Sequence, residues 1–108
     1  MTTFDKREQG FEAKFAHDAE LMFKATARSN KLLGLWAAEK MGLSEVEADA
    51  YAKDVVRADF EEAGDEDVIR KLLGDLTSAG VDTNEEAIRE ALGFKTVEAR
   101  RQIIEASN

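Results

Sequence analysis

The sequence predicts an all-α fold, a compact four-helix bundle with a flexible N-terminal arm. The chain has no proline and only seven glycines, while helix-favouring Ala, Glu, Leu and Lys are abundant. Apolar residues also recur at three- and four-residue spacings in four stretches, which glycines and helix-capping residues separate. A chain of 108 residues can bury one modest core. We predict that residues 18–108 form the bundle and residues 1–17 form a mobile arm.

The first bundle helix is predicted from about Asp18 to Met41. It ends there because Gly42 follows, and glycine suits the left-handed conformation of a C-terminal cap. Its larger apolar side chains are expected in the core: Leu32, Leu33, Leu35 and Trp36.

The second helix begins at a predicted capping box, in which Ser44 and Glu47 bond each other's backbone N–H groups. We expect it to end by Gly64. Its predicted core face comprises Val46, Ala50, Tyr51, Val55 and Ala58.

The third helix is predicted between an Asp65 cap and Gly80. Glu66 and Asp67 in its first turn favour this assignment, because the helix dipole stabilises acidic side chains there. Its predicted buried face comprises Val68, Ile69, Leu72, Leu73, Leu76 and Ala79.

The fourth helix is predicted to begin at a second capping box, formed by Thr83 and Glu86. Its apolar stripe comprises Ile88, Ala91, Leu92, Ala99 and Ile103. Three apolar residues lie off that stripe: Phe94, Val97 and Ile104. A kink near Gly93 and a wider contact surface are both compatible with this pattern.

The N-terminal arm holds three of the six phenylalanines among many charged residues. On a helix Phe4, Phe11, Phe15 and Met22 would fall within roughly 40° of one another. This apolar stripe would either extend the protein's own core or bind a partner. The segment is too short and too charged to form a stable helix alone, so we expect it to fold on binding.

The charge is unevenly distributed along the chain. The formal net charge is −8; residues 1–40 carry seven basic and six acidic side chains, so +1, and the remainder carries eight and seventeen, so −9. No basic stripe exists to displace the counterions of a nucleic acid, so we expect no nucleic-acid partner. The nearly neutral first part could approach a protein surface without strong repulsion.

Several classes of chemistry are disfavoured. There is no cysteine and only one histidine, His17, so a Cys/His metal site or a catalytic triad cannot be assembled. The residues from Asp59 fit a calcium loop poorly, because Ala63 and Arg70 occupy two ligand positions. No phosphate-binding glycine loop is present. We therefore expect neither an enzyme nor a metal site, and we interpret His17 as a solvated residue, with pH sensing as the alternative.

Targeting signals are not evident in the sequence. No apolar run reaches the roughly 18 residues of a membrane span. Asp5, Glu8 and Glu12 interrupt the place where the apolar stretch of a signal peptide would lie. We expect a cytoplasmic protein.

Four blocks of sequence carry a resemblance to a known family. In chain order they read "EAKFAHD", "NKLLGLWAAEK", "VVRADFEE" and "GDEDV". Residues 2–76, which contain them, resemble the alphaproteobacterial zeta subunit family, inhibitors of the F-type ATP synthase. The resemblance implies a four-helix protein whose mobile N-terminal segment enters the catalytic head, between catalytic subunits and rotor, and blocks ATP hydrolysis.

The resemblance also implies which residues bind the partner. The inhibitory positions that it carries over are Phe4, Asp5, Arg7, Glu8, Phe11, Glu12, Lys14 and Phe15. The implied partner is the catalytic head of the F-type ATP synthase, which would hold the protein at the cytoplasmic face of the membrane without insertion. The alternative is a stand-alone helical adaptor or an adenine-nucleotide-binding regulatory domain. We expect no cofactor beyond weak binding of an adenine nucleotide by the bundle.

Overall fold

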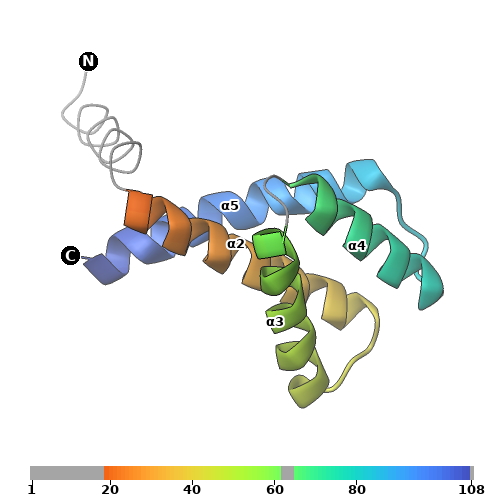
Figure 1. Ribbon diagram of the computed structural model, residues 1–108. Helices are drawn as coiled ribbons and strands as arrows, with labels where there is room; N and C mark the ends of the chain where they lie inside the picture. The colour runs from red at the N-terminus through yellow and green to blue at the C-terminus, as the bar shows by residue number, and fades with distance from the viewer. Residues whose placement is uncertain (1–18, 62–64, 108) are drawn as a thin grey trace.

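The computed structural model describes residues 19–61 and 65–107. Four α-helices account for most of this part of the chain, and it contains no strand (Figure 1). They are α2 (Ala19–Lys40), α3 (Glu45–Glu61), α4 (Glu66–Ser78) and α5 (Glu85–Ser107). The prediction of an all-α four-helix bundle is confirmed.

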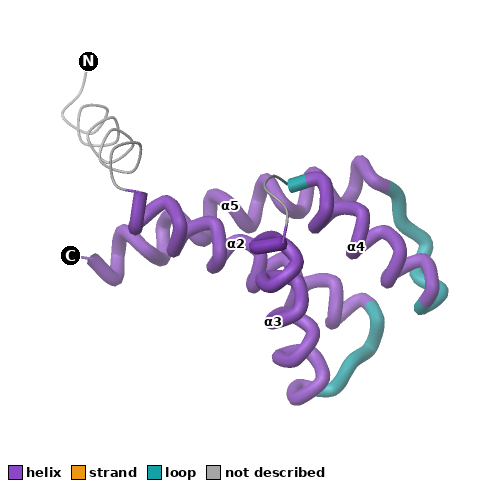
Figure 2. Tube along the Cα trace, viewed as in Figure 1, coloured by secondary structure: helices purple, strands orange, loops and turns teal. Residues whose placement is uncertain are grey.

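The two longest helices, α2 and α5, run antiparallel and form the long axis of the bundle (Figure 1). Helices α3 and α4 pack on the half of this pair that lies away from the chain termini. Short turns join α2 to α3 and α4 to α5 (Figure 2). Near the termini, α2 and α5 have only each other as neighbours among the described residues.

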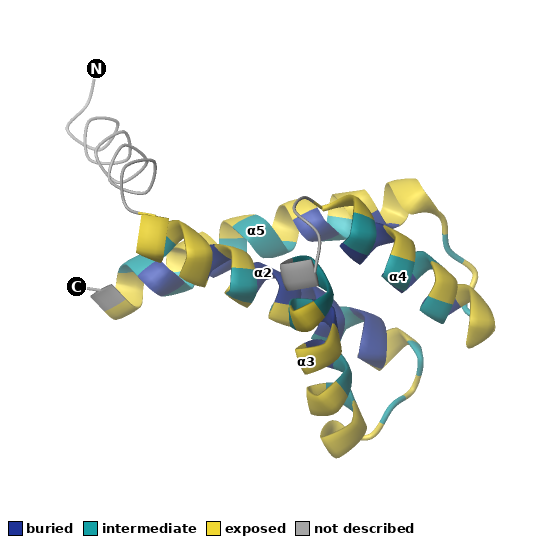
Figure 3. Cartoon of the chain, viewed as in Figure 1, coloured by how far each residue is buried: buried dark blue, intermediate teal, exposed yellow. Residues whose placement is uncertain are grey.

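The main core lies where all four helices meet. Its buried residues are Leu33, Ala37, Val55, Val68, Ile69, Leu72, Leu76, Ile88 and Leu92. A second, smaller cluster lies toward the termini, where Ala25 of α2 packs with Ile103 of α5, and Leu21 and Ile104 flank them. The smaller cluster leaves much of the first turns of α2 exposed (Figure 3).

Two helices end at glycines, as the sequence predicts. Gly42 and Gly80 have φ values of +74° and +81°, in the left-handed region. After α2, the N–H of Leu43 donates to the carbonyl of Ala38 at 3.1 Å, and after α4 Val81 donates to Leu76 at 2.9 Å. These six-to-one bonds define the Schellman motif, which satisfies carbonyls that the end of a helix leaves free.

The start of α3 also confirms the predicted capping box. The backbone N–H of Ser44 donates to Glu47 Oε1 at 3.1 Å, and the N–H of Glu47 donates to Ser44 Oγ at 3.2 Å. The hydrogen bonds from the Ser44 backbone and hydroxyl lower the pKa of the Glu47 carboxyl. Asp65 occupies the N-cap position of α4, but its side chain makes no capping hydrogen bond.

The predicted capping box of Thr83 and Glu86 is wrong by one residue. Asn84 caps α5 instead, because its Oδ1 accepts the N–H of Ala87 at 2.8 Å. The helix therefore begins at Glu85. Asn is at least as good an N-cap as Thr, so two adjacent residues were competing for the same role.

The predicted core face of α3 is partly wrong. Val46 is 81% exposed, and Ala50 is exposed as well, whereas Ala52 and Val55 are fully buried. Val46 lies nine residues before Val55, a rotation of about 900°, which places the two side chains on opposite faces of a helix. The end of this helix near Gly64 lies outside the described residues.

Other core predictions need smaller corrections. Ala79 of the third predicted stripe is exposed, since α4 has already ended. In α2 only Leu33 of the four predicted core residues is fully buried. The other three are partly exposed: Leu32, Leu35 and Trp36. The Lys40 ammonium lies over the Trp36 ring, 5.2 Å from its centroid.

Candidate functional site

All predicted partner-binding residues lie outside the described residues. They are Phe4, Asp5, Arg7, Glu8, Phe11, Glu12, Lys14 and Phe15, and His17 lies outside as well. Their assignment therefore stays a prediction. The description begins at Ala19, where α2 starts, and the fourth residue of the predicted stripe, Met22, belongs to this helix. Met22 is 44% exposed.

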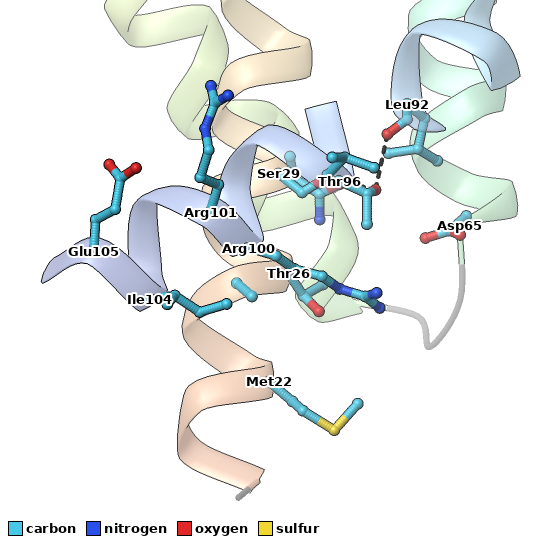
Figure 4. Close-up of a pocket in the computed structure, with 13 residues that line it drawn as sticks. Met22, Thr26, Ser29, Asp65, Leu92, Thr96, Arg100, Arg101, Ile104 and Glu105 are labelled. Carbon is cyan, nitrogen blue, oxygen red and sulfur yellow. Dashed lines mark hydrogen bonds between the residues drawn. The ribbon is translucent and has the colours of Figure 1, made fainter. Parts of the chain in front are cut away.

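A cavity of about 860 Å³ lies against Met22, between α2 and α5 and beside the start of α4 (Figure 4). Its apolar lining includes Met22, Ala25, Leu92, Val97 and Ile104. Its polar lining includes Thr26, Ser29, Asn30, Asp65, Thr96, Arg100, Arg101 and Glu105. The site thus combines a partly apolar wall with charged side chains at its edges.

A hydrogen-bonded link between α2 and α5 forms part of the wall. Thr96 Oγ1 donates to the carbonyl of Leu92, 2.8 Å away in the same helix. Ser29 Oγ lies 3.1 Å from Thr96 Oγ1. A hydroxyl has one proton, so Ser29 is the donor and Thr96 the acceptor between the helices. This link fixes the spacing of α2 and α5 at the inner end of the cavity.

Asn30 lies next to this link and is only 1% exposed. Among the described residues its Nδ2 atom has no hydrogen-bond partner of good geometry, yet its amide is close enough to the Asp59 carboxyl to influence it. Burial and the negative charge of Asp65 raise the pKa of Asp59, and the interaction with Asn30 partly opposes this. The inner end of the cavity is therefore polar, and the Asp59 carboxyl lies behind Asn30 and not in the lining.

The α5 edge of the cavity carries two arginines, Arg100 and Arg101, and one acid, Glu105. Arg100 and Arg101 are both exposed, and within the described residues neither forms an ion pair. Arg100 reaches toward the side where Asp65 lies, whereas Arg101 points the other way (Figure 4). Two adjacent cations are notable on a chain whose net charge is −8, because they can bind acidic groups that the rest of the surface repels.

A second, shallower hollow of about 360 Å³ lies at the other end of the α2–α5 pair. It is lined by Trp36, Ala87, Glu90, Ala91, Phe94 and Lys95. Phe94 and Val97 are 68% and 69% exposed, so these two off-stripe residues of α5 belong to the surface, whereas the third, Ile104, is half-buried against the smaller core cluster.

In the described part of the chain, no three His, Cys, Asp or Glu side chains gather where they could hold a metal ion. The helices of that part also lack the length and apolar character that crossing a membrane requires.

Sequence reasoning missed the polar wall of the cavity because it looked for apolar residues. A signal was nevertheless present. Ser29 precedes the buried Leu33 by four residues and Ala37 by eight, so it lies on the core face of α2. Polar residues in that phase indicate a buried polar contact, which here is the bond to Thr96.

Comparison with known proteins identifies the family. The model of a family described as ATPase inhibitor subunit zeta matches residues 1–102, so the likeness extends beyond residues 2–76. A protein solved by solution NMR is 49% identical to this chain, with a TM-score of 0.71, over 80% of this chain and 98% of its own. Curated proteins include none that matches. The chain therefore belongs to the ATPase inhibitor subunit zeta family.

Proposed function

We propose that this protein inhibits ATP hydrolysis by the F-type ATP synthase, and that its N-terminal segment does so by inserting into the catalytic head. In this proposal residues 4–15 lie between the catalytic subunits and the rotor. The match of the inhibitor family to residues 1–102 supports it most directly, because the match includes the arm as well as the bundle.

The energetics of the arm favour a partner large enough to bury it. Each phenylalanine that becomes fully buried contributes up to about 1.5–3 kcal/mol. Ordering the backbone of a dozen residues costs about 1–2 kcal/mol for each residue. The three rings cannot offset that cost alone. Binding therefore also needs the charged side chains of the arm and a rigid helix continuing into it, which α2 provides from Ala19 onward.

The bundle then acts as a carrier that presents the arm. Its caps and its four-helix core hold α2, and the described core begins at Leu21 and Ala25. We infer a regulatory and non-enzymatic protein that is held at the cytoplasmic face of the membrane through the ATP synthase.

The test is ATP hydrolysis by purified catalytic head in the presence of the full chain. Replacing Phe4, Phe11 and Phe15 together by Ala removes the stripe and keeps every charge. We expect this variant to lose most of the inhibition. Val46→Ala is the control, because Val46 is an exposed apolar residue on α3, 81% accessible. Full inhibition by the triple variant would contradict the insertion mechanism.

The alternative of an adaptor or an adenine-nucleotide-binding domain remains a prediction. No observation on the described residues favours it over inhibition. The same assay discriminates between the two, because an adaptor would leave hydrolysis by the catalytic head unchanged. Titrating ADP into the isotope-labelled full chain, with amide chemical shifts as the readout, tests nucleotide binding separately.

A further inference from the structure

Three apolar side chains, Met22, Val97 and Ile104, lie on the wall of the cavity between α2 and α5, and together they are called its apolar rim. The described residues include five exposed large apolar side chains, and two of them, Met22 and Val97, line this cavity. Val97 is 69% exposed. Ile104, half-buried, continues the apolar surface along α5. Scattered exposed apolar residues are common, but a set that lines one hollow indicates a binding surface.

We propose that in the free protein the arm, residues 4–15, folds back and docks in this cavity. This inference rests on the proposed function, since it describes how the inhibitory segment is stored before the catalytic head binds it. The phenylalanine stripe would then cover the apolar rim, and the catalytic head would have to displace the arm from the cavity.

The position of the arm in the chain makes this docking feasible. The described chain begins at Ala19, less than one turn before Met22 on the cavity wall. A reversal within residues 16–18 would leave a twelve-residue segment, about 18 Å long as a helix. From Met22 to Asn30, both on the wall, α2 rises about 12 Å. The arm is therefore long enough to cover the cavity.

The side chains of the arm also complement the cavity. If the arm is helical, Glu8 and Glu12 lie about 20° and 60° from Phe15, on one flank of the phenylalanine stripe. Arg100 and Arg101 of α5, which line the cavity together with the acids Asp65 and Glu105, carry the opposite charge. The acidic flank of the stripe can therefore pair with an arginine beside the apolar rim, Arg100 on one side or Arg101 on the other (Figure 4).

Docking within one chain needs little intrinsic affinity. A short flexible tether gives an effective concentration in the millimolar range, so an interaction of about millimolar strength would keep much of the arm docked. The apparent affinity for the head equals the intrinsic affinity multiplied by the fraction of time for which the arm is free. An arm docked for about three quarters of the time would thus gain about fourfold in apparent affinity on release.

Paramagnetic relaxation enhancement tests the docking directly in the full chain. The sequence contains no cysteine, so Ala13→Cys carries a single nitroxide; on a helix this position faces away from the stripe. We expect broadening of the amide signals of Val97 and Ile104, with the signals near Val46 unaffected. Absence of broadening at Val97 and Ile104 would overturn the proposal. Broadening that disappears when the nitroxide-carrying chains are diluted with unlabelled chains would also overturn the proposal, because the arm in the cavity would then belong to a second copy of the protein.

Inhibition of the catalytic head provides the second readout. Val97→Asp places a charge on the rim and should release the arm, so we expect a half-inhibitory concentration about threefold to fivefold lower than that of the native chain. Val46→Asp is the matched control, because it adds the same charge at an exposed valine of α3. Weaker inhibition by Val97→Asp would overturn the proposal, since it would make the rim a contact with the head.

The two experiments test the fold-back of the arm and the proposed inhibitory function separately. If neither the native chain nor any variant inhibits hydrolysis, the proposed function is wrong, while the nitroxide measurement still decides whether the arm docks. If the native chain inhibits but the nitroxide leaves Val97 and Ile104 sharp, the fold-back is wrong and the proposed function stands.

Discussion

Gly34 of α2 and Ala52 of α3 are in such close contact that no side chain fits at position 34. A Cβ atom on Gly34 would lie 2.8 Å from the Cα of Ala52 and 3.2 Å from Val55 Cγ2. Ala52 and Val55 are fully buried. The obstructing atom at 2.8 Å belongs to the backbone, so it cannot rotate away. The glycine therefore sets the distance between the two helices.

Gly34→Ala should consequently destabilise the bundle. Overpacking costs about 1–3 kcal/mol, while Ala gains about 1 kcal/mol over Gly in a helix interior, so we expect a net loss of up to about 2 kcal/mol in the free energy of unfolding. Gly74→Ala is the control, because a Cβ there meets nothing within 4 Å, and it should stabilise the protein. Urea unfolding measures both. Equal gains from the two substitutions would show that the helices are not in close contact at Gly34.

The N-cap of α5 can be tested by comparing two adjacent residues. Asn84→Ala removes the bond to the N–H of Ala87 and should cost about 1 kcal/mol, or about 4–8 °C in Tm. Thr83→Ala should change stability by less than about 0.5 kcal/mol. Thermal unfolding followed by circular dichroism decides between them. A larger effect at Thr83 would restore the capping box that the sequence suggested.

Because of Tyr51, we expect the stability of the protein to fall as the pH rises in the alkaline range. Its hydroxyl donates to Asp75 Oδ2 at 2.7 Å, and Lys71 Nζ lies 3.1 Å from the same oxygen. Burial first, and then the hydrogen bond to Asp75, raise the pKa of Tyr51 well above its usual value of about 10. The neutral hydroxyl therefore contributes stability below about pH 10, and this contribution is lost as the pH rises further.

Tyr51→Phe should accordingly cost about 1–2 kcal/mol at neutral pH. The difference from the native chain should shrink above about pH 10, because the unfolded native chain then loses its tyrosine proton and the variant has none to lose. Urea unfolding at several pH values measures this. Since Tyr51 is the only tyrosine, tyrosinate absorbance also follows its ionisation in the folded chain. Half-ionisation at or below about pH 10 would contradict the buried bond.

Asp59 should lower the stability of the protein at neutral pH, whereas the Tyr51 hydroxyl raises it. Burial, and next the charge of Asp65, raise the pKa of its carboxyl. An acid with a raised pKa contributes stability only below its unfolded value, about 3.9, and this is lost as the pH rises through the folded value. At neutral pH the charged carboxylate is a net cost. Asp59→Asn should therefore raise the free energy of unfolding at neutral pH, with little change near pH 3.

Asp82→Asn is the control for that substitution, since Asp82 is exposed in the connection between α4 and α5. It also removes one negative charge from the acidic chain. If both substitutions stabilise the protein equally, the gain comes from the net charge, and the local account of Asp59 fails.

The helix ends were predictable because the signals there are local. Gly42 and Gly80 end their helices as predicted, and Ser44 and Glu47 form the predicted capping box. These interactions depend on residues within one turn of each other. Where Thr83 and Asn84 offered competing caps, the local signal was ambiguous, and the prediction failed by one residue.

Tertiary contacts were less predictable because small and polar residues make them. The close approach of α2 and α3 depends on Gly34 and Ala52, neither of which carries a strong hydrophobic signal. The link between Ser29 and Thr96 joins hydroxyl groups far apart in the sequence. Core predictions weighted by large apolar side chains therefore included the exposed Val46 and missed these contacts. The predicted arm residues lie outside the described part of the chain.

The most direct test of the central claim is hydrolysis of ATP by the catalytic head with a chain that lacks residues 1–15. The described core begins at Leu21 and Ala25, so the shortened chain should fold, which circular dichroism confirms beforehand. We predict that it leaves hydrolysis at the uninhibited rate, while the full chain blocks it. Full inhibition by the shortened chain would place the blocking surface on the bundle and contradict the assignment of inhibition to the arm.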